Sequence, residues 1–186
     1  MSDPTYVMEE PAILQEIGDA EGLRILDLGC GDAAIGRVLL DAGCRAYLGV
    51  DGSANMVEAA RTTLRGTSGE VVRADPEDFN APPASFDLVL SRLALHYVEH
   101  IDVMLCACHN CLSPGGRLIC TVVHPVISSH DARANTEQLR TNWVVDDYFS
   151  AGPRDQNWLG GTVVWHHRTL RRGHIPMLLL LAGTRV

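Results

Sequence analysis

Two features that would point to a large charged or apolar partner are missing from this sequence. Its 186 residues include only 15 Lys or Arg against 23 Asp or Glu, a net charge of −8 with no general attraction to nucleic-acid phosphates or anionic lipid. The longest apolar run, Met177–Ala182, is far shorter than the roughly 20 residues that cross a bilayer. The N-terminus shows neither segment of a secretory signal. We expect a cytoplasmic protein with a small-molecule partner and neither a nucleic-acid nor a membrane partner.

A disulfide framework is missing as well. The six cysteines are scattered through apolar segments, as reduced and buried thiols are: Cys30, Cys44, Cys106, Cys108, Cys111 and Cys120. The stretch Cys106-x-Cys108-His109-x-Cys111 has residue types that could bind zinc. Its three cysteines fall within one predicted helix, however, where Cys106 and Cys108 point to different faces, and no second ligand pair follows. We predict no metal site.

The sequence does contain a regular alternation of short apolar blocks with blocks of helical period. Helices are predicted at 11–17, 33–42, 54–64 and 101–111, and strands at 24–28, 46–50, 70–73, 86–91 and 117–123. Ser113–Gly116 is predicted as the turn between the last helix and the last strand. This order indicates an α/β fold with a Rossmann-like, doubly wound and mostly parallel sheet. The length suits a single domain over residues 1–186.

Residues 125–170 differ in composition from the rest. They are polar, contain several Asn and Asp residues, and include all three tryptophans, Trp143, Trp158 and Trp165. We interpret them as a lid or substrate-facing insertion of the same domain. Residues 162–166 are a candidate for one more strand, of antiparallel type.

A glycine turn follows the first predicted strand. Residues 25–36 read ILDLGCGDAAIG, which places Asp27 near the end of the strand and Gly29 and Gly31 in the turn. Residues without side chains let a ligand lie against the backbone. The spacing is Asp-x-Gly-x-Gly, not the Gly-x-Gly-x-x-Gly of a dinucleotide site, and Asp32 stands where a pyrophosphate favours a small neutral residue. A ligand without phosphates is favoured.

Two more carboxylates follow the next predicted strands. Asp51 ends the second strand about twenty residues further on, and it can accept hydrogen bonds from both hydroxyls of a ribose. Asp75 follows the third strand, where it could accept the amino hydrogen of adenine. Since parallel strands end at the same edge of a sheet, we expect Asp27, Asp51 and Asp75 to converge on one nucleoside-containing ligand.

With these segments, the chain resembles the class I S-adenosylmethionine-dependent methyltransferases, specifically their type 11 small-molecule group. The matching segments occur in the expected order: ILDLGCG, VDGSANMVEAAR, RADPEDF, FDLVLSRLALHYVEH and LSPGGRLICTVVHP. The resemblance spans about residues 20 to 125 and continues weakly through VDDYFSAGPR and WHHRTL. It implies S-adenosylmethionine as cofactor, S-adenosylhomocysteine as product, and methyl transfer to an oxygen, nitrogen or carbon of a small metabolite.

The resemblance also implies which residues surround the cofactor. The methionine part would lie on the glycine turn, the ribose would bind Asp51, and the adenine amino group would face Asp75. Further residues would flank the adenosine or close the pocket. The implied set is Asp27, Gly29, Cys30, Gly31, Asp51, Gly52, Ser53, Met56, Asp75, Pro76, Glu77, Ser91 and Leu93.

The chain departs from the family in two places. Pro76 has no backbone N–H to offer to adenine, so Glu77 or the Asp75 side chain must compensate. Relatives continue after the HRTL segment with a helix and an antiparallel pair of strands, whereas here Arg171–Pro176 break the helical pattern. We expect the C-terminal antiparallel hairpin to be missing, which would leave the fifth strand uncovered and favour a homodimer through the sheet edge.

Two histidines are candidates for a catalytic base, which would help if the acceptor is a hydroxyl or an acidic carbon. His96 follows the fourth strand and His124 the fifth, so both lie at the edge where such sheets bind ligands. Alternatively, His96 and Tyr97 pack against the cofactor or the following helix.

The acceptor pocket is predicted in the same region and in the lid. Its candidate residues are Tyr97, Trp143, Tyr148, Trp165 and His166. The tryptophans could equally form the core of the lid, and His166 could simply end a lid strand. A competing functional hypothesis is a non-catalytic or non-methylating S-adenosylmethionine-binding protein of the same fold.

Overall fold

The computed structural model describes residues 4–129, 145, 147–158, 161–169 and 178–184. The helices are α1 (Pro4–Ile17), α2 (Ala34–Asp41), α3 (Ala54–Thr63), the 3₁₀ turn η1 (Leu95–Tyr97), α4 (Ile101–Cys111) and α5 (Pro125–Ser128). The strands are β1 (Arg24–Leu28), β2 (Ala46–Asp51), β3 (Glu70–Arg73), β4 (Phe86–Arg92), β5 (Leu112–Val123), β6 (Gly152–Trp158), β7 (Gly161–His167) and β8 (Leu178–Thr184). The predicted order of helices and strands is confirmed.

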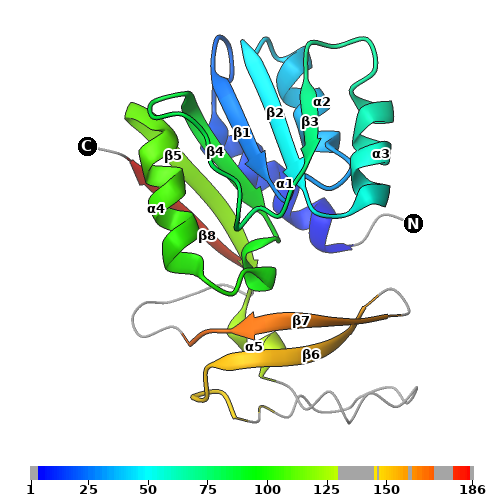
Figure 1. The fold of residues 1–186 in the computed structure, drawn as a ribbon, viewed down its shortest axis with the longest axis vertical. Helices are drawn as coiled ribbons and strands as arrows, with labels where there is room; N and C mark the ends of the chain where they lie inside the picture. The colour runs from blue at the N-terminus through cyan, green and yellow to red at the C-terminus, as the bar shows by residue number, and fades with distance from the viewer. Residues whose placement is uncertain (1–3, 130–144, 146, 159–160, 170–177, 185–186) are drawn as a thin grey trace.

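The main sheet has six strands in the order β3-β2-β1-β4-β5-β8 (Figure 1). Strands β1 to β5 pair in parallel, and β8 pairs antiparallel with β5. The strand order reverses between β1 and β4, which is the switch point where open α/β sheets bind ligands. The Rossmann-like α/β prediction is confirmed.

The edge of β5 is covered, which the sequence analysis did not expect. Residues 178–184 pair with 117–123 along seven consecutive positions. The apolar run at the C-terminus is thus a strand, and one antiparallel strand of the expected missing pair is present among the described residues. The argument for a homodimer through an uncovered β5 therefore fails, because the hydrogen-bonding groups of that edge already pair with β8.

Two apolar layers hold the helices on the sheet. Ile13, Ile35 and Leu39 of α1 and α2 pack with residues of α3 against one face, in a fully buried cluster. Met104 and Cys108 of α4 pack against the other face, in front of β4 and β5 in Figure 1. No helix lies between β3 and β4, so residues 74–85 cover this second face as a loop.

Two element boundaries differ from the prediction. Helix α1 begins at Pro4, not at Pro11, which lies within the helix. Strand β5 begins at Leu112 because Ser113–Gly116 form an irregularity inside the strand: between Phe86↔Leu112 and Leu88↔Arg117, β5 advances by five residues while β4 advances by two. The residues that predicted a turn therefore produce a bulge.

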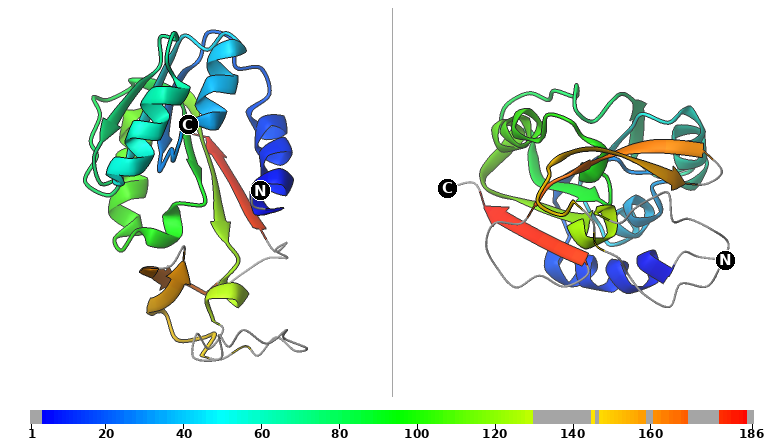
Figure 2. Two further views of the ribbon diagram at one scale, coloured as in Figure 1. Left: turned by 90° about the vertical axis from the view of Figure 1, so that its right-hand side faces the viewer. Right: turned by 90° about the horizontal axis from the view of Figure 1, so that it is seen from below.

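The polar C-terminal third contains a separate antiparallel hairpin of β6 and β7, paired from Gly152↔His167 to Trp158↔Gly161. The predicted strand at 162–166 is part of it. Figure 1 shows this hairpin beyond the carboxyl ends of the parallel strands, and Figure 2 shows the same separation from the side. Within the described residues, no helix is both long and apolar enough to cross a membrane.

Candidate functional site

The turn after β1 fits tightly against the turn after β4. Gly29 has a φ of +77°, and a Cβ added there would lie 2.3 Å from the Cβ of Ala94. The N–H groups of Gly29 and Cys30 both donate to the carbonyl oxygen of Val50, at 2.8 and 3.1 Å. This close packing leaves no alternative to glycine at position 29.

Gly31 differs from Gly29 because open space lies over it. A Cβ at Gly31 would meet nothing within 4 Å, and one at Gly52 would meet only a carbonyl oxygen at 3.8 Å. Between them lies Asp51, whose carboxylate accepts hydrogen bonds from the N–H groups of Gly31 at 2.9 Å and Ser53 at 2.8 Å. A carboxylate has about four lone-pair directions, so two remain for ribose hydroxyls. The open space and the free acceptors fit the predicted nucleoside.

Asp27 is a buried carboxylate with half of its hydrogen-bonding capacity unused. It is 1% exposed, and its Oδ2 accepts a hydrogen bond from the Tyr47 hydroxyl at 2.7 Å. Its Oδ1 has no hydrogen-bond partner among the residues that the structure describes. Burial raises the pKa of Asp27 to about 6, against the opposing hydrogen bond from Tyr47 and the charge of Arg92. A cationic ligand group, such as the ammonium of the cofactor's methionine part, would satisfy Oδ1.

Several other predicted cofactor residues make protein contacts that shape the same edge. The Ser91 hydroxyl is fully buried and donates to the Leu28 carbonyl oxygen at 2.9 Å, joining the ends of β4 and β1. Ser53 caps α3 by accepting from the N–H of Met56 at 3.4 Å. Met56 is half exposed, Cys30 is buried against Gly49, and Leu93 has a φ of +49°. The cofactor roles of these residues remain predictions.

The loop after β3 presents Asp75 to solvent and turns Glu77 inward. Asp75 accepts the N–H of Glu77 at 3.0 Å. The Glu77 carboxylate accepts the N–H groups of Glu99 at 2.9 Å and His100 at 2.7 Å, at the start of α4. Although desolvation acts to raise it, the pKa of Glu77 is lowered by these two donors and by the charges of His100 and His166. Of the two groups predicted to compensate for Pro76, Asp75 accepts one hydrogen bond and is exposed, whereas Glu77 accepts two from the start of α4.

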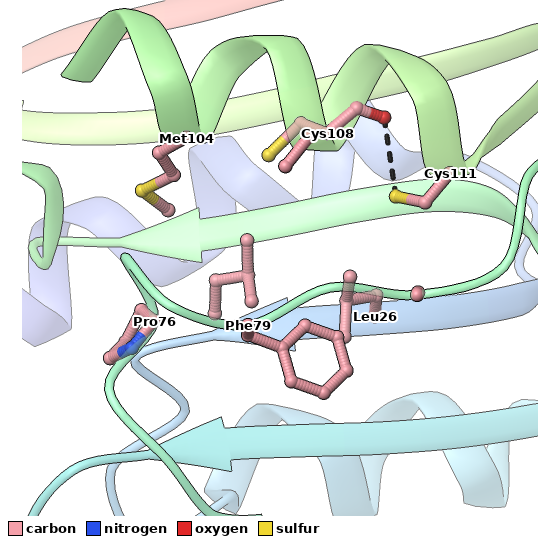
Figure 3. A pocket seen from close by; sticks show the side chains of 9 residues that line it. Leu26, Pro76, Phe79, Met104, Cys108 and Cys111 are labelled. Carbon is pink, nitrogen blue, oxygen red and sulfur yellow. Dashed lines mark hydrogen bonds between the residues drawn. The ribbon is translucent and has the colours of Figure 1, made fainter. Parts of the chain in front are cut away.

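Pro76 lies over a small apolar hollow between this loop, β1 and α4. Figure 3 shows Pro76 and Phe79 facing Leu26, Met104 and Cys108 across it. The hollow has room for about one water molecule. It belongs to the packing beneath the site and is too small for an adenine ring.

The two candidate bases have environments that do not favour proton abstraction. Burial lowers the pKa of His96 to about 4, so the imidazole is neutral at neutral pH, and its buried Nδ1 has no hydrogen-bond partner in the described part of the chain. His124 caps α5, with its Nδ1 accepting the N–H of Val126 at 3.1 Å. In the neutral ring the proton is then on Nε2, and the lone pair that a base requires is already used. A catalytic role for either residue remains a prediction.

The predicted acceptor residues fall into two groups. Trp165 is buried and packs edge-on against His96, with ring centroids 4.7 Å apart, and near Tyr97 at 6.3 Å. Tyr148 instead packs on His167, at 5.7 Å. His166 lies beside Trp165 on β7, and Trp143 lies outside the residues that the structure describes.

Four residues organise this region, and the sequence indicates a role for only one of them: His167, like His166, is expected to line the acceptor cavity or to end a lid strand. His167 is 1% exposed and bridges the Ser128 hydroxyl at 2.7 Å and the Tyr148 carbonyl at 2.8 Å. Arg168 donates to carbonyl oxygens of the segment after η1. Glu9 is fully buried and pairs with Arg92. Their partners are distant in sequence, so no local motif reveals them.

A comparison with protein families matches residues 26–120 to the family described as "Methyltransferase domain". The matched region begins in β1 and ends in β5, and it includes the glycine turn, Asp51 and Asp75. The chain therefore belongs to the methyltransferase-domain family.

Solved structures agree with that assignment. A crystal structure of an S-adenosylmethionine-dependent methyltransferase from Mesorhizobium loti is 39% identical, with a TM-score of 0.78 over 87% of this chain and 74% of its own. A protein from Listeria monocytogenes, proposed to be such an enzyme, is 25% identical, with a TM-score of 0.84 over 99% of this chain and 100% of its own. The predicted class I resemblance is confirmed, and the chain is a methyltransferase that uses S-adenosylmethionine.

Curated relatives extend beyond the shared domain. A demethylmenaquinone methyltransferase from Tropheryma whipplei is 33% identical over 115 residues, which cover 61% of this chain and 48% of the relative. The chain thus spans about half the length of that relative, and the match leaves the choice of acceptor open.

Proposed function

We propose that this protein transfers the methyl group of S-adenosylmethionine to a small metabolite, at an oxygen, nitrogen or carbon atom. The observation that supports the proposal is the hairpin β6–β7, which places Trp165 against His96 and Tyr97 beside the cofactor edge of the sheet. An aromatic wall that faces a cofactor site suits a small, partly apolar acceptor.

When bound, S-adenosylmethionine supplies an electrophilic methyl group on a positively charged sulfur. In this proposal Asp27 would hold a ligand ammonium through Oδ1, which has no hydrogen-bond partner among the described residues, and Asp51 would hold the ribose through its remaining lone pairs. In this proposal the rings on η1 and β7 would help to exclude water from the bound cofactor and acceptor. Positioning and exclusion of water supply much of the rate of such a transfer.

The environments of the two histidines favour some chemical classes of acceptor over others. Burial lowers the pKa of His96 to about 4, and the Nδ1 of His124 already accepts the N–H of Val126. An acceptor that is already nucleophilic near neutral pH, such as an amine, a thiolate or a carboxylate, needs no base. We therefore place these acceptors ahead of alcohols.

Calorimetry with S-adenosylhomocysteine tests the cofactor half of the proposal. We expect binding by the wild type and a large loss in Asp51→Ala, with Asp41→Ala on the exposed surface of α2 as the matched control. A folded wild-type sample that shows no binding would refute the proposal. Incubation with S-adenosylmethionine and a panel of amines, thiols, carboxylic acids and alcohols then tests transfer. Binding without methylated product from any class would favour the non-catalytic alternative.

A further inference from the structure

Two consecutive peptide groups after η1 lie between a carboxylate and a guanidinium. The first consists of the Val98 carbonyl and the Glu99 N–H, and the second of the Glu99 carbonyl and the His100 N–H. The Glu77 carboxylate accepts both N–H groups, at 2.9 and 2.7 Å. Arg168 Nη2 donates to both carbonyl oxygens, with a distance of 3.0 Å to that of Glu99. Each of the two peptide groups therefore joins the Glu77 carboxylate to the Arg168 guanidinium.

This arrangement strengthens all of its hydrogen bonds. Each bond has one charged partner, which makes it shorter and stronger than a neutral one, and the charges at both ends polarise the peptide groups in the same sense. Burial lowers the pKa of Arg168, while the charges of Glu77 and Asp102 act to raise it. Glu77 and Arg168 thus place opposite charges at the two ends of the same two peptide groups.

The two ends of the pair belong to the two halves of the site. Glu77 donates its N–H to Asp75, the predicted adenine contact, at 3.0 Å. Arg168 follows β7, three residues after Trp165. Between the two ends, the backbone segment continues directly from His96 and Tyr97, the residues against which Trp165 packs.

We propose that Glu77 and Arg168 are positioning residues that act as a pair through these two peptide groups. Together they fix the η1 segment under Trp165 and join the loop that carries Asp75 to the hairpin β6–β7. The proposal rests on the proposed function, since it assigns these two regions to the cofactor and the acceptor. Neither side chain contacts the reacting atoms, so their effect is on geometry.

A simpler role for each residue is local. Glu77 would then only cap α4, whose N-cap His100 has no side-chain cap of its own, and Arg168 would only fasten the end of β7. The two interpretations differ in one respect. If the residues act as a pair, removal of the Glu77 charge changes the environment of Trp165 in the same way as removal of the Arg168 charge.

The test uses Trp165 as the only tryptophan, in a full-length Trp143→Phe, Trp158→Phe background. We measure its emission maximum and its quenching by acrylamide in Glu77→Gln, Arg168→Gln and the double variant. Arg117→Gln is the matched control, because Arg117 also binds two carbonyl oxygens, those of Glu16 and Ile17, but at the far end of α1.

We expect each single variant to shift the Trp165 emission to longer wavelength and to increase its quenching. The double variant should shift it no further than either single variant, because the pair is lost once either end is removed. Arg117→Gln should leave both measurements unchanged, even if the melting temperature falls. The proposal is wrong if Glu77→Gln leaves Trp165 unaffected, or if the two shifts simply add.

Binding of S-adenosylhomocysteine separates this proposal from the proposed function. Arg168→Gln should bind it within about twofold of the background protein, as expected for a residue outside the cofactor contacts. In the background protein, the ligand should decrease the quenching of Trp165, and this decrease should be lost in Arg168→Gln. No binding by any variant would refute the proposed function, while the fluorescence shifts of the unliganded variants would still test the pair. Binding with an unchanged decrease in Arg168→Gln would refute the coupling alone.

Discussion

Lowering the pH from 7 to 5 should weaken the binding of S-adenosylhomocysteine about tenfold, because the cofactor ammonium needs Asp27 ionised. Burial raises the pKa of this carboxyl from 3.8 to about 6 in the free protein. An ammonium at the unpartnered Oδ1 returns the pKa in the complex towards its ordinary value. At pH 5, about ten of every eleven free molecules then carry a proton that must leave on binding. This corresponds to about 1.4 kcal/mol of binding free energy.

The raised pKa of Asp27 also makes the stability of the free protein depend on pH. This stability falls as the pH rises, whereas the binding of S-adenosylhomocysteine strengthens. The folded state holds the Asp27 proton more tightly than the unfolded chain, so the free energy of unfolding falls as the pH rises from about 4 to 6 and is then constant. A shift from 3.8 to about 6 corresponds to about 3 kcal/mol. The ionised carboxylate therefore destabilises the free protein at neutral pH, and ligand binding relieves that penalty.

Calorimetry between pH 5 and 8 measures the binding effect directly. Titrations at pH 5 in two buffers of different ionisation enthalpy should show the release of about one proton. Asp27→Asn should bind weakly and independently of pH. Tyr47→Phe removes a hydrogen bond that lowers the Asp27 pKa, so it should move the transition to higher pH. A wild-type affinity that is flat between pH 5 and 8, or an Asp27→Asn profile like that of the wild type, would refute the reasoning.

Four further predictions concern packing, charge and the exposure of a thiol. Gly29→Ala should lower the free energy of unfolding by about 3 kcal/mol in urea, because its added Cβ would meet another side chain at 2.3 Å. At Gly31 the added Cβ would meet open space, so Gly31→Ala should lower the free energy of unfolding by only about 1 kcal/mol, because of the positive φ. Its main effect should be weaker binding of S-adenosylhomocysteine. A larger loss of stability in Gly31→Ala than in Gly29→Ala would contradict the packing argument. Glu9→Ala should lower the free energy of unfolding by about 3–5 kcal/mol, since it removes the buried carboxylate that pairs with the Arg92 guanidinium; an unchanged melting temperature would refute this. Cys106 is the exposed thiol of the six, so Ellman's reagent should modify one thiol quickly in the native protein, and Cys106→Ser should abolish that fast phase.

The sequence alone determined the glycine turn and the carboxylate beside it, because both depend on local sequence features. A glycine turn after an apolar strand and a carboxylate at the end of the next strand depend on neighbours a few residues apart, and the structure places Asp51 on the backbone of Gly31 accordingly. The parallel order of β1 to β5 follows from the alternation of strands and helices. The sequence analysis went wrong at Ser113–Gly116 and at the C-terminus. At Ser113–Gly116, residues typical of a turn form a bulge within β5. At the C-terminus, an apolar run pairs with β5, a strand more than fifty residues earlier.

Tertiary structure alone decided which contacts the individual side chains around the glycine turn and η1 make. Glu77 was predicted from its neighbours as an adenine contact, yet it binds the start of α4, 22 and 23 residues further on. His96 carries no sign in its sequence of the burial that keeps it neutral, and Arg168 none of the carbonyl groups that it holds. Burial and long-range hydrogen bonds depend on which segments the fold brings together. A single sequence therefore predicted the edge at which the cofactor would bind, and only the tertiary structure showed that the hairpin β6–β7 packs on η1.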